Sequence, residues 1–447
     1  MHFSNVYLRV CKKKTNINLN QLVMISEKLL HYIWKNQWFA KENIETVQKQ
    51  SVSIISQGFP HQDAGPDFKQ AIIKIDDVTW AGNVEIHIRS SDWYKHEHQK
   101  DMKYDSVILH VVYEHDREVC NSQDVPIPTL ELQNLLSSQL LLRYNQLMNT
   151  PLTIPCEAYI NTIHPLTIQS FFDRLIFDRL TRRQSQIFEV LHSFSGDWEQ
   201  TLFYLLCQGF GFKTNAPAFE MLGKTLPYKI LKKHVDSHLQ VTALIFGQAG
   251  MLDEELDDPY YQSLQNEYLY LKSKYRLIPI DVKGWNLLRL RPHNFPCVRL
   301  AQLGELIFNH HYLLEKITTP HKLAYFQNIF INKTDDYWAT HYYFGKASRK
   351  SEKIMGTQSF HLLLINVLIP LLYAYGTFMG QEKLQEYSTQ LLEILPFEEN
   401  HITKKYQKIG FCAKHASDSQ ALLELHHEYC EKKRCIDCGI GHRVVSV

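Results

Sequence analysis

The stretch "AGPDFKQAIIKIDDVTWAGNVEIHIRS" (residues 64–90) decides the fold of the first part of this chain. Asp67 stands directly before one apolar run, and Glu85 lies inside the next one. A carboxylate within a strand must be solvated, paired with a cation or bound to a metal ion, because burying a bare charge is costly. The question is what these two acidic side chains do.

Two strands are expected around these carboxylates, at residues 69–77 and 79–90, joined by a tight turn of two aspartates. Side chains two positions apart on a strand leave the same face, so Glu85 and His87 are expected to lie together. Asp67, at the mouth of the neighbouring strand, is expected to converge on that face. The pattern predicts a small group of polar side chains at one edge of a sheet.

The neighbouring segments complete a mixed α/β module. Residues 26–38 have apolar side chains at helical spacing, and residues 106–116 are almost continuously apolar, which is typical of a buried strand. The expected elements are a helix at 26–38, strands at 51–56, 69–77 and 79–90, a short helix beginning at Ser91 or Asp92, and a strand at 106–116. This order is α-β-β-β-α-β.

After about residue 130 the sequence favours helices. The predicted helices are 131–147, 165–192, 198–211, 216–233, 239–251, 259–275, 299–316, 359–375, 381–395 and 417–430. A proline-rich stretch, "NTPLTIPCEAYINTIHP" (149–165), is the best candidate boundary. We therefore predict an α+β protein with a nuclease-like α/β domain at 24–150 and a helical domain with a Cys-rich tail at 151–447.

Composition sets few limits on function. The chain has 447 residues, 45% of them hydrophobic, and its 48 Lys and Arg balance 47 Asp and Glu, so a surface for nucleic acid would have to be local. The arginines of 171–186 fit a helix with local ion pairs better than a phosphate track.

The longest apolar run, 360–378, contains Pro370 and is expected to be a buried helix. We expect a cytoplasmic protein without membrane contact.

The order of elements, with "GPDF" (65–68) before one strand and "GNVEIH" (82–87) in the next, resembles the PD-(D/E)XK nuclease superfamily. The resemblance implies a restriction-endonuclease-like core, a nucleic-acid partner, and Mg²⁺ or Mn²⁺ bound by Asp67 and Glu85. His87 stands where that superfamily has lysine. A histidine there would activate or orient water, or bind the metal itself.

Three further residues are expected to support this site: His98, Asp101 and Tyr104. If the segment is helical, His98 and Asp101 share a face because they are three residues apart. A different reading takes His87, His96, His98, Asp101 and His110 as a transition-metal site, which would make the protein a histidine-rich hydrolase. The third reading is a nuclease-like scaffold without catalysis, which the lysine-to-histidine departure supports.

Over its full length the chain also resembles an uncharacterised bacterial family, one of the domains of unknown function. The matching stretches span residues 24–441. They are "LLHYIWK", "AGPDF", "WAGNVEIH", "SSDWYKH", "VILHVV", "GFGFKTNAPAFE", "ALIFGQAGML", "RLRPHNFPCVRLAQL" and the cysteine cluster near residue 435. This resemblance implies no activity and no oligomeric state.

The tail "CEKKRCIDCGIGHR" (430–443) carries three thiols within nine positions, Cys430, Cys435 and Cys438, followed by His442. A C-x2-C pair with one or two further ligands suits tetrahedral Zn²⁺, and an iron–sulfur cluster is the alternative. Cys412, His426, His427 and His442 are the candidates for the remaining ligand, with His442 preferred.

Overall fold

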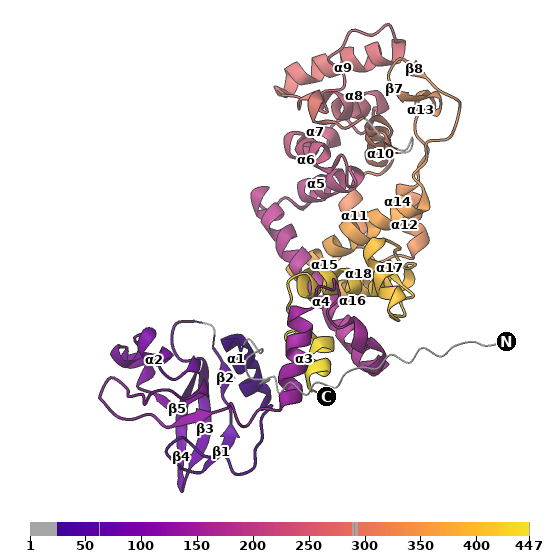
Figure 1. Ribbon diagram of the computed structural model, residues 1–447. Coiled ribbons are helices and arrows are strands. Elements are labelled where there is room, and N and C mark those ends of the chain that lie inside the picture. Colours follow the sequence, from indigo (N-terminus) through magenta and orange to yellow (C-terminus); the bar gives the residue numbers. More distant parts are fainter. Residues whose placement is uncertain (1–24, 62, 288–289, 291–293, 447) are drawn as a thin grey trace, which may run out of the picture. The chain divides into compact units, whose positions relative to one another are not determined.

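The computed structural model describes residues 25–61, 63–287, 290 and 294–446 (Figure 1). The chain forms two compact units. Unit 1 comprises the described residues up to Phe171 together with those from Leu425 onward, and unit 2 comprises Phe172–Glu424. Residue 24, where the first domain was predicted to begin, lies outside the described residues.

Unit 1 contains a mixed sheet and a few helices. Its elements are α1 (Glu27–Asn36), β1 (Val52–Ser56), β2 (Phe59–Pro60), β3 (Phe68–Ile75), β4 (Val78–Arg89), α2 (Asp92–Lys95), β5 (Val107–Glu114), β6 (Thr129–Glu131), α3 (Ser138–Asn149) and α19 (Gly439–Ser446). Short 3-10 turns at His98–Lys100, Met102–Tyr104 and Glu157–Thr162 and a π-helical turn at Leu425–Cys430 complete it. The predicted α-β-β-β-α-β order is confirmed, with β2 and β6 as additional short strands.

The strands lie side by side in the order β1-β3-β4-β5-β6, with β2 paired to β3. Strands β1 to β5 are labelled in Figure 1. β3 and β4 form an antiparallel hairpin in which Ile75 pairs with Val78, so Asp76 and Asp77 make the turn as expected. Asp76 has a positive φ of 52°, which aspartate tolerates in such turns. β4 and β5 are parallel, and the α2 segment crosses between them.

Helix α1 packs against β4. The Ser26 hydroxyl caps it by accepting a hydrogen bond from the Leu29 backbone N–H at 3.2 Å. Leu29, Leu30, Ile33 and Trp34 are fully buried, which fixes the face that α1 turns to the sheet. The remaining polar side chains of the helix are therefore held in defined positions beside β4.

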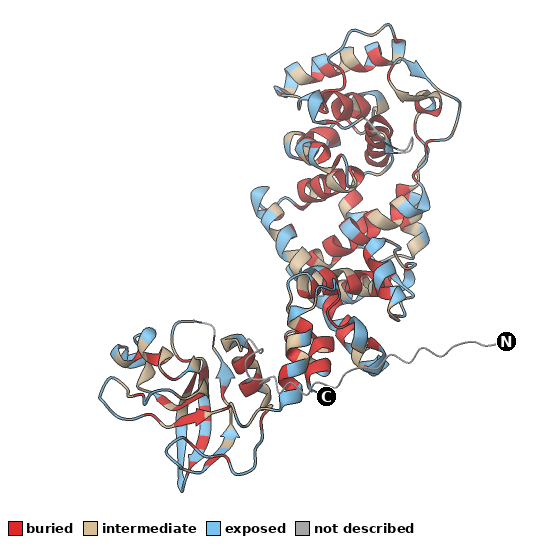
Figure 2. Ribbon diagram, viewed as in Figure 1, coloured by how far each residue is buried: buried red, intermediate tan, exposed pale blue. Residues whose placement is uncertain are grey.

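Unit 2 is almost entirely helical. It contains the remainder of α4 (Pro165–Ser193), then α5 (Trp198–Phe210), α6 (Ala216–Thr225), α7 (Tyr228–Lys232), α8 (His238–Gln248), α9 (Pro259–Tyr275), α10 (Pro296–Asn309), α11 (Leu313–Thr318), α12 (Leu323–Phe330), α13 (Asp336–Thr340), β7 (His341–Tyr343), β8 (Lys346–Ala347), α14 (Thr357–Leu363), α15 (Ile369–Phe378), α16 (Glu382–Ile394), α17 (His401–Lys408) and α18 (Ala416–Glu424). Figure 2 shows buried residues along most of α5, α8 and α10, which supply the core. The predicted α+β class is confirmed.

One helical segment, Thr357–Phe378, is long and apolar enough to cross a membrane by length and composition alone. However, 72% of its most apolar window is buried inside the protein, as in the core helix of a globular domain. It runs from α14 through a π-helical turn at Leu364–Leu368 into α15. Pro370 stands in the first turn of α15, where its missing N–H costs little.

The compact units divide the chain differently from the predicted boundary near residue 150. Unit 1 extends to Phe171, within α4, and residues from Leu425 onward belong to it rather than to the helical unit. The physical reason is that α19 packs against α3, and Ile440 and Val445 are almost completely buried there. Periodicity along the chain does not reveal which distant segment a helix packs against.

Candidate metal and hydrolysis site

Strands β3 and β4 bring the two carboxylates into one site. Glu85 Oε2 accepts a hydrogen bond from the Asp67 backbone N–H at 3.1 Å, and Asp67 Oδ2 accepts one from the Ile86 backbone N–H at 2.9 Å. Each carboxylate therefore holds the strand that carries the other. His87 leaves β4 on the same face as Glu85, and its Nε2 lies 3.7 Å from Glu85 Oε1. The structure thus places Asp67, Glu85 and His87 together.

Glu85 is a buried acid, with 4% of its surface exposed. Burial raises its pKa above the ordinary value, and the charge of Asp67 acts in the same direction. The contact with His98 and the hydrogen bond from the Asp67 N–H oppose this shift. A carboxylate in such a position is stabilised by a positive charge close to it, either a proton or a metal ion.

Three histidine rings gather next to Glu85. One nitrogen from each of His87, His96 and His98 lies within 4.8 Å of the other two. His98 Nε2 is 3.2 Å from Glu85 Oε1, and His87 Nε2 is 3.0 Å from His96 Nδ1. His87 and His98 are buried, whereas His96 is exposed and marks the side of the site that faces solvent.

His110 on β5 supports His87 from behind. Its Nε2 lies 2.9 Å from His87 Nδ1, and its ring is fully buried. Burial, together with the other histidines, lowers the pKa of both rings, that of His110 to about 3. Two neutral rings at this distance share one N–H, so His110 fixes the orientation of His87. It occupies a supporting position behind the ring of His87.

Helix α1 contributes His31, which the sequence did not point to. Its Nε2 lies 3.2 Å from Asp67 Oδ2. Burial opposes protonation, but the hydrogen bond to Asp67 and its charge raise the pKa of His31 above the ordinary value. Glu27 lies one turn earlier in α1. Burial raises the pKa of its carboxyl, and the nearby His31 acts in the opposite direction. Glu45, which follows α1 in the sequence, is exposed and pairs with Lys49 at 3.7 Å.

Aromatic rings wall the site on the α2 side. Tyr104 stacks on His98 with ring centroids 3.8 Å apart, and the buried Trp93 contacts both His98 and His110 at 5.3 Å. Burial and the charge of Glu85 raise the pKa of Tyr104 to about 12, so its hydroxyl stays protonated. Tyr104 therefore lies beside the histidine cluster as expected.

Asp101 takes a different position. The helix expected over this segment is replaced by α2 and two separate 3-10 turns, so His98 and Asp101 do not share a helix face. Asp101 is exposed, and its carboxylate caps the second turn by accepting a hydrogen bond from the Lys103 backbone N–H at 3.0 Å. The left-handed backbone of Glu97, with φ 60°, interrupts the helix.

The donor atoms fit a divalent ion. Ligands at about 2.1 Å from an ion are separated from one another by roughly 3.0–3.5 Å, and several distances between the imidazole and carboxylate atoms fall in this range. His98 Nε2 is buried and makes no hydrogen bond of normal geometry, although it faces Glu85. Mixed imidazole and carboxylate donors suit Mn²⁺, Zn²⁺, Co²⁺ or Fe²⁺ better than Mg²⁺, which prefers oxygen.

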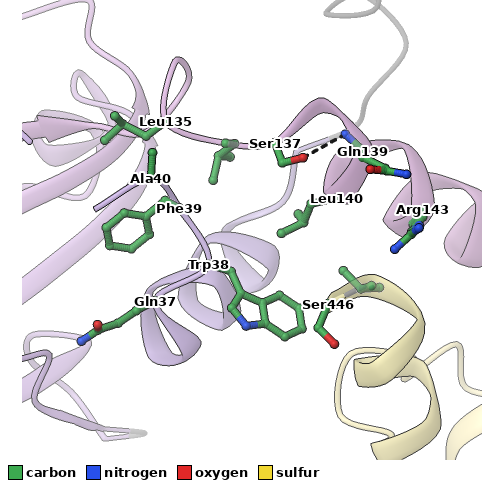
Figure 3. Close-up of a pocket in the computed structure, with 12 residues that line it drawn as sticks. Gln37, Trp38, Phe39, Ala40, Leu135, Ser137, Gln139, Leu140, Arg143 and Ser446 are labelled. Atoms are coloured by element: carbon green, nitrogen blue, oxygen red, sulfur yellow. Dashed lines mark hydrogen bonds between the residues drawn. The ribbon is translucent and has the colours of Figure 1, made fainter. Parts of the chain in front are cut away.

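A pocket of about 500 Å³ lies elsewhere in unit 1 (Figure 3). Trp38 and Phe39 line one side, Leu140 and Arg143 of α3 another, and Ser446 of α19 a third. Its lining residues include no histidine, cysteine or carboxylate. It therefore offers none of the acid–base or metal-binding groups of the histidine–carboxylate site.

The arginine-rich helix α4 makes ion pairs. Glu424 is buried, and its Oε2 lies 2.5 Å from Arg182 Nη2 and 3.5 Å from Arg179 Nη1. Arg182 Nε donates a further hydrogen bond to the same carboxylate at 3.2 Å. These contacts favour the structural interpretation of the arginines, as partners in ion pairs within the protein, over a track that binds phosphates.

The fold and the site define a two-unit α+β protein whose first unit carries a buried histidine–carboxylate cluster between β3, β4 and α1. Residues 27–401 match the family described as "Protein of unknown function (DUF2851)". The chain belongs to this family, which confirms the resemblance to a domain of unknown function over most of its length. No curated protein and no solved structure matches the chain.

Proposed function

We propose that unit 1 hydrolyses phosphodiester bonds in nucleic acid with the help of a divalent metal ion, as a nuclease of the PD-(D/E)XK type. The observation that carries the proposal is the pair of reciprocal hydrogen bonds that sets Asp67 and Glu85 side by side. The order of helices and strands along unit 1 also resembles the order that is typical of this superfamily. The protein would act in the cytoplasm, consistent with a structure in which no disulfide joins two described cysteines.

Each side chain of the site has its own role in this proposal. Asp67 and Glu85 would hold the ion together with imidazole nitrogens of His87, His96 and His98, which lie within 4.8 Å of one another. A bound divalent ion supplies Lewis acidity, which polarises a phosphoryl oxygen and lowers the pKa of bound water. His31, kept protonated more readily by Asp67, offers a positive charge beside that carboxylate. The exposed ring of His96 lies where substrate would enter from solvent.

The histidines favour a specific form of this proposal. His87, His96 and His98 bring three nitrogens to the carboxylates, which supports the histidine-rich transition-metal hydrolase over an ion held by oxygen alone. We therefore expect Mn²⁺, Zn²⁺ or Co²⁺ to support activity better than Mg²⁺.

A second candidate is a nuclease-like scaffold that binds without cutting. His87 contacts His110 and His96, and burial lowers its pKa, so its ring is uncharged. It does not provide the fixed positive charge that lysine would provide at this position. This observation supports a unit that keeps the shape of a nuclease but not its chemistry.

The test is cleavage of labelled single- and double-stranded DNA and RNA by the purified full chain, with Mg²⁺, Mn²⁺, Zn²⁺ or Co²⁺ added separately. Glu85→Gln keeps an oxygen for the Asp67 N–H but removes the charge, and we expect at least a roughly 100-fold loss of activity. Asp101→Asn is the matched control, because Asp101 is an exposed carboxylate of the same unit, and it should retain activity.

Equal activity in the wild type and in Glu85→Gln would refute the proposed site. Binding of a divalent ion by the wild type, measured by calorimetry and lost in His98→Ala, without cleavage of any of the four substrates, would support the scaffold instead.

A further inference from the structure

The cysteine-rich tail, which the sequence predicts to bind a metal ion, does not form a ligand set in the structure. Cys430, Cys435 and Cys438 are buried, but in the described part of the chain only histidines bring three ligand atoms within 4.8 Å of one another. His442, the preferred fourth ligand, instead hydrogen-bonds through Nδ1 to the Tyr32 hydroxyl. Metal binding by the tail therefore stays a prediction from the sequence.

Unit 2 contains two buried cations whose partners are all uncharged. Arg299 has 3% of its surface exposed, and Lys353 has 1%. Within the described part of the chain, both side chains bond to amide, hydroxyl and carbonyl oxygens, and no carboxylate is among their partners. Burying a charge without an opposite charge beside it is costly. Two such cations in one unit therefore call for a source of negative charge.

Three oxygen atoms hold the Arg299 guanidinium in place. Nη1 donates to Gln302 Oε1 at 2.9 Å, and Nη2 donates to Asn294 Oδ1 at 2.7 Å and to Ser359 Oγ at 3.0 Å. The guanidinium carbon lies 4.5 Å from the centroid of the Phe212 ring. Nε is buried and has no partner among the described residues, so one donor of the group stays free. Burial lowers the pKa of Arg299 to about 10, which leaves it charged at neutral pH.

Lys353 belongs to the same group of side chains. Its backbone carbonyl accepts a hydrogen bond from Gln302 Nε2 at 2.8 Å, so Gln302 joins the segment of Lys353 to the guanidinium of Arg299. The Lys353 Nζ donates to Ser351 Oγ at 2.7 Å and lies 3.8 Å from the centroid of the Tyr342 ring. A hydroxyl and a ring face attract the ammonium group but do not neutralise it.

The first turn of α10 adds to the positive potential. Arg299 is the fourth residue of this helix, and Asn294, which accepts from its guanidinium, stands just before the N-cap residue Phe295. Phe295 provides no side-chain hydrogen bond, so the N–H groups at this helix end lack the usual capping oxygen. A helix N-terminus carries about half a positive charge. Together with the two cations, this gives a local charge of roughly +2.5.

We propose that this part of unit 2 binds a phosphate group, with Arg299 and Lys353 as its cationic contacts. The phosphate is either free or the monoester of a small molecule such as a nucleotide. Such a group carries about −1.5 to −2 charges at pH 7, which balances the two cations better than a single carboxylate would. The planar guanidinium, with its free Nε, matches the spacing of phosphate oxygens. This site lies in unit 2 and does not depend on the hydrolytic activity proposed for unit 1.

Calorimetric titration of the full chain at constant ionic strength tests the proposal with two probes, inorganic phosphate and a nucleoside 5′-monophosphate. EDTA is present throughout, so that no divalent ion links the probes to the histidine–carboxylate site of unit 1. We expect saturable binding of about one probe molecule per chain at about 1 mM or below. Equal affinities would identify free phosphate as sufficient, and tighter binding of the nucleotide would show that the nucleoside is held as well. The absence of saturable binding of either probe to the folded wild type would overturn the proposal.

Single substitutions locate the binding. Arg299→Gln and Lys353→Met each remove one charge and should weaken binding at least about tenfold, because charge-assisted hydrogen bonds are the strong ones. Lys350→Gln is the matched control, since Lys350 is an exposed cation three residues from Lys353, and affinity should change less than about twofold. Unchanged affinity in folded Arg299→Gln would refute the site and leave Arg299 as a tie between α10 and its neighbours.

A measurement on the wild type alone covers the case in which these variants do not fold. Phosphate also stabilises proteins generally, because it is excluded from their surfaces. Hydrogen exchange is therefore followed for seconds, when local openings dominate, with phosphate in place of chloride at equal ionic strength. Exchange should slow in the first turn of α10 and around Lys353 but not in α9. Equal slowing in α9, or no slowing at all, would count against the site.

Discussion

Substituting Ile440 by alanine should destabilise unit 1, although nearly 270 residues separate this side chain from Phe171, where the N-terminal part of the unit ends. Ile440 is fully buried in α19, which packs against α3. Alanine removes three carbons, which corresponds to about 2.4 kcal/mol at about 0.8 kcal/mol for each buried CH₂. The cavity left behind adds to this, so the expected loss is about 3 kcal/mol.

Native-state hydrogen exchange measures this loss where it occurs. A decrease of about 3 kcal/mol raises the opening equilibrium by roughly 100-fold, since about 1.4 kcal/mol corresponds to tenfold. Faster exchange is expected in α3 and α1, because α1 contacts the tail through Lys28 and Asp437 at 2.9 Å. The helices at the core of unit 2, such as α8, should exchange as in the wild type.

The matched control is Ile55→Ala. Ile55 lies on β1 of the same unit with 60% of its surface exposed, so its truncation should change stability by less than about 0.5 kcal/mol. Unchanged exchange in α3 and α1 of Ile440→Ala would show that the tail does not stabilise the N-terminal sheet and its helices. Equal acceleration in α8 would show that the two units unfold together.

Three other substitutions test single contacts. Glu424→Gln removes the buried partner of two partly exposed arginines and should cost unit 2 about 2 kcal/mol in urea unfolding; an unchanged midpoint would contradict this. His238 bonds Glu305 at 2.7 Å, which raises its pKa despite partial burial. That contribution is complete below the unfolded-state pKa and is lost as pH rises through the folded-state value, so stability should fall more between pH 6 and 8 in the wild type than in His238→Gln. Gly82→Ala would place a Cβ 2.7 Å from a backbone carbonyl of the neighbouring segment and cost about 1–3 kcal/mol, whereas Gly284→Ala, with open space around it, should be neutral by thermal unfolding.

The sequence predicted the sheet well because its signals are local. The Asp76-Asp77 turn fixed the hairpin, and once the hairpin is in register, Glu85 and His87 must share a face. The apolar run at 106–116 likewise became the buried strand β5. Most predicted helices also agree with the structure, although 216–233 divides at Pro227 into α6 and α7.

The rest of the candidate site depends on contacts between segments that are distant in sequence. His31 reaches Asp67 only because the buried face of α1 sets the angle at which the helix packs on β4. One signal was available: Glu27 and His31 are four residues apart, on one face of an amphipathic helix. Nothing in the local pattern indicated that Cys156, a single cysteine in a proline-rich stretch, would belong to the same compact unit as the cysteines of the tail.

The discontinuous construction of unit 1 has a consequence for the order in which the protein folds during synthesis. The sheet and α1 leave the ribosome first, but α19 follows only after about 250 further residues, Phe172–Glu424. At about 5–20 residues per second, the incomplete unit waits roughly 10–50 s for its last helix. We expect unit 2 to fold during this interval and the first-made part of the chain to become stable last. Proteolysis of ribosome-bound chains stalled before Leu425 should then spare unit 2 and cleave α3; protection of both would refute this order.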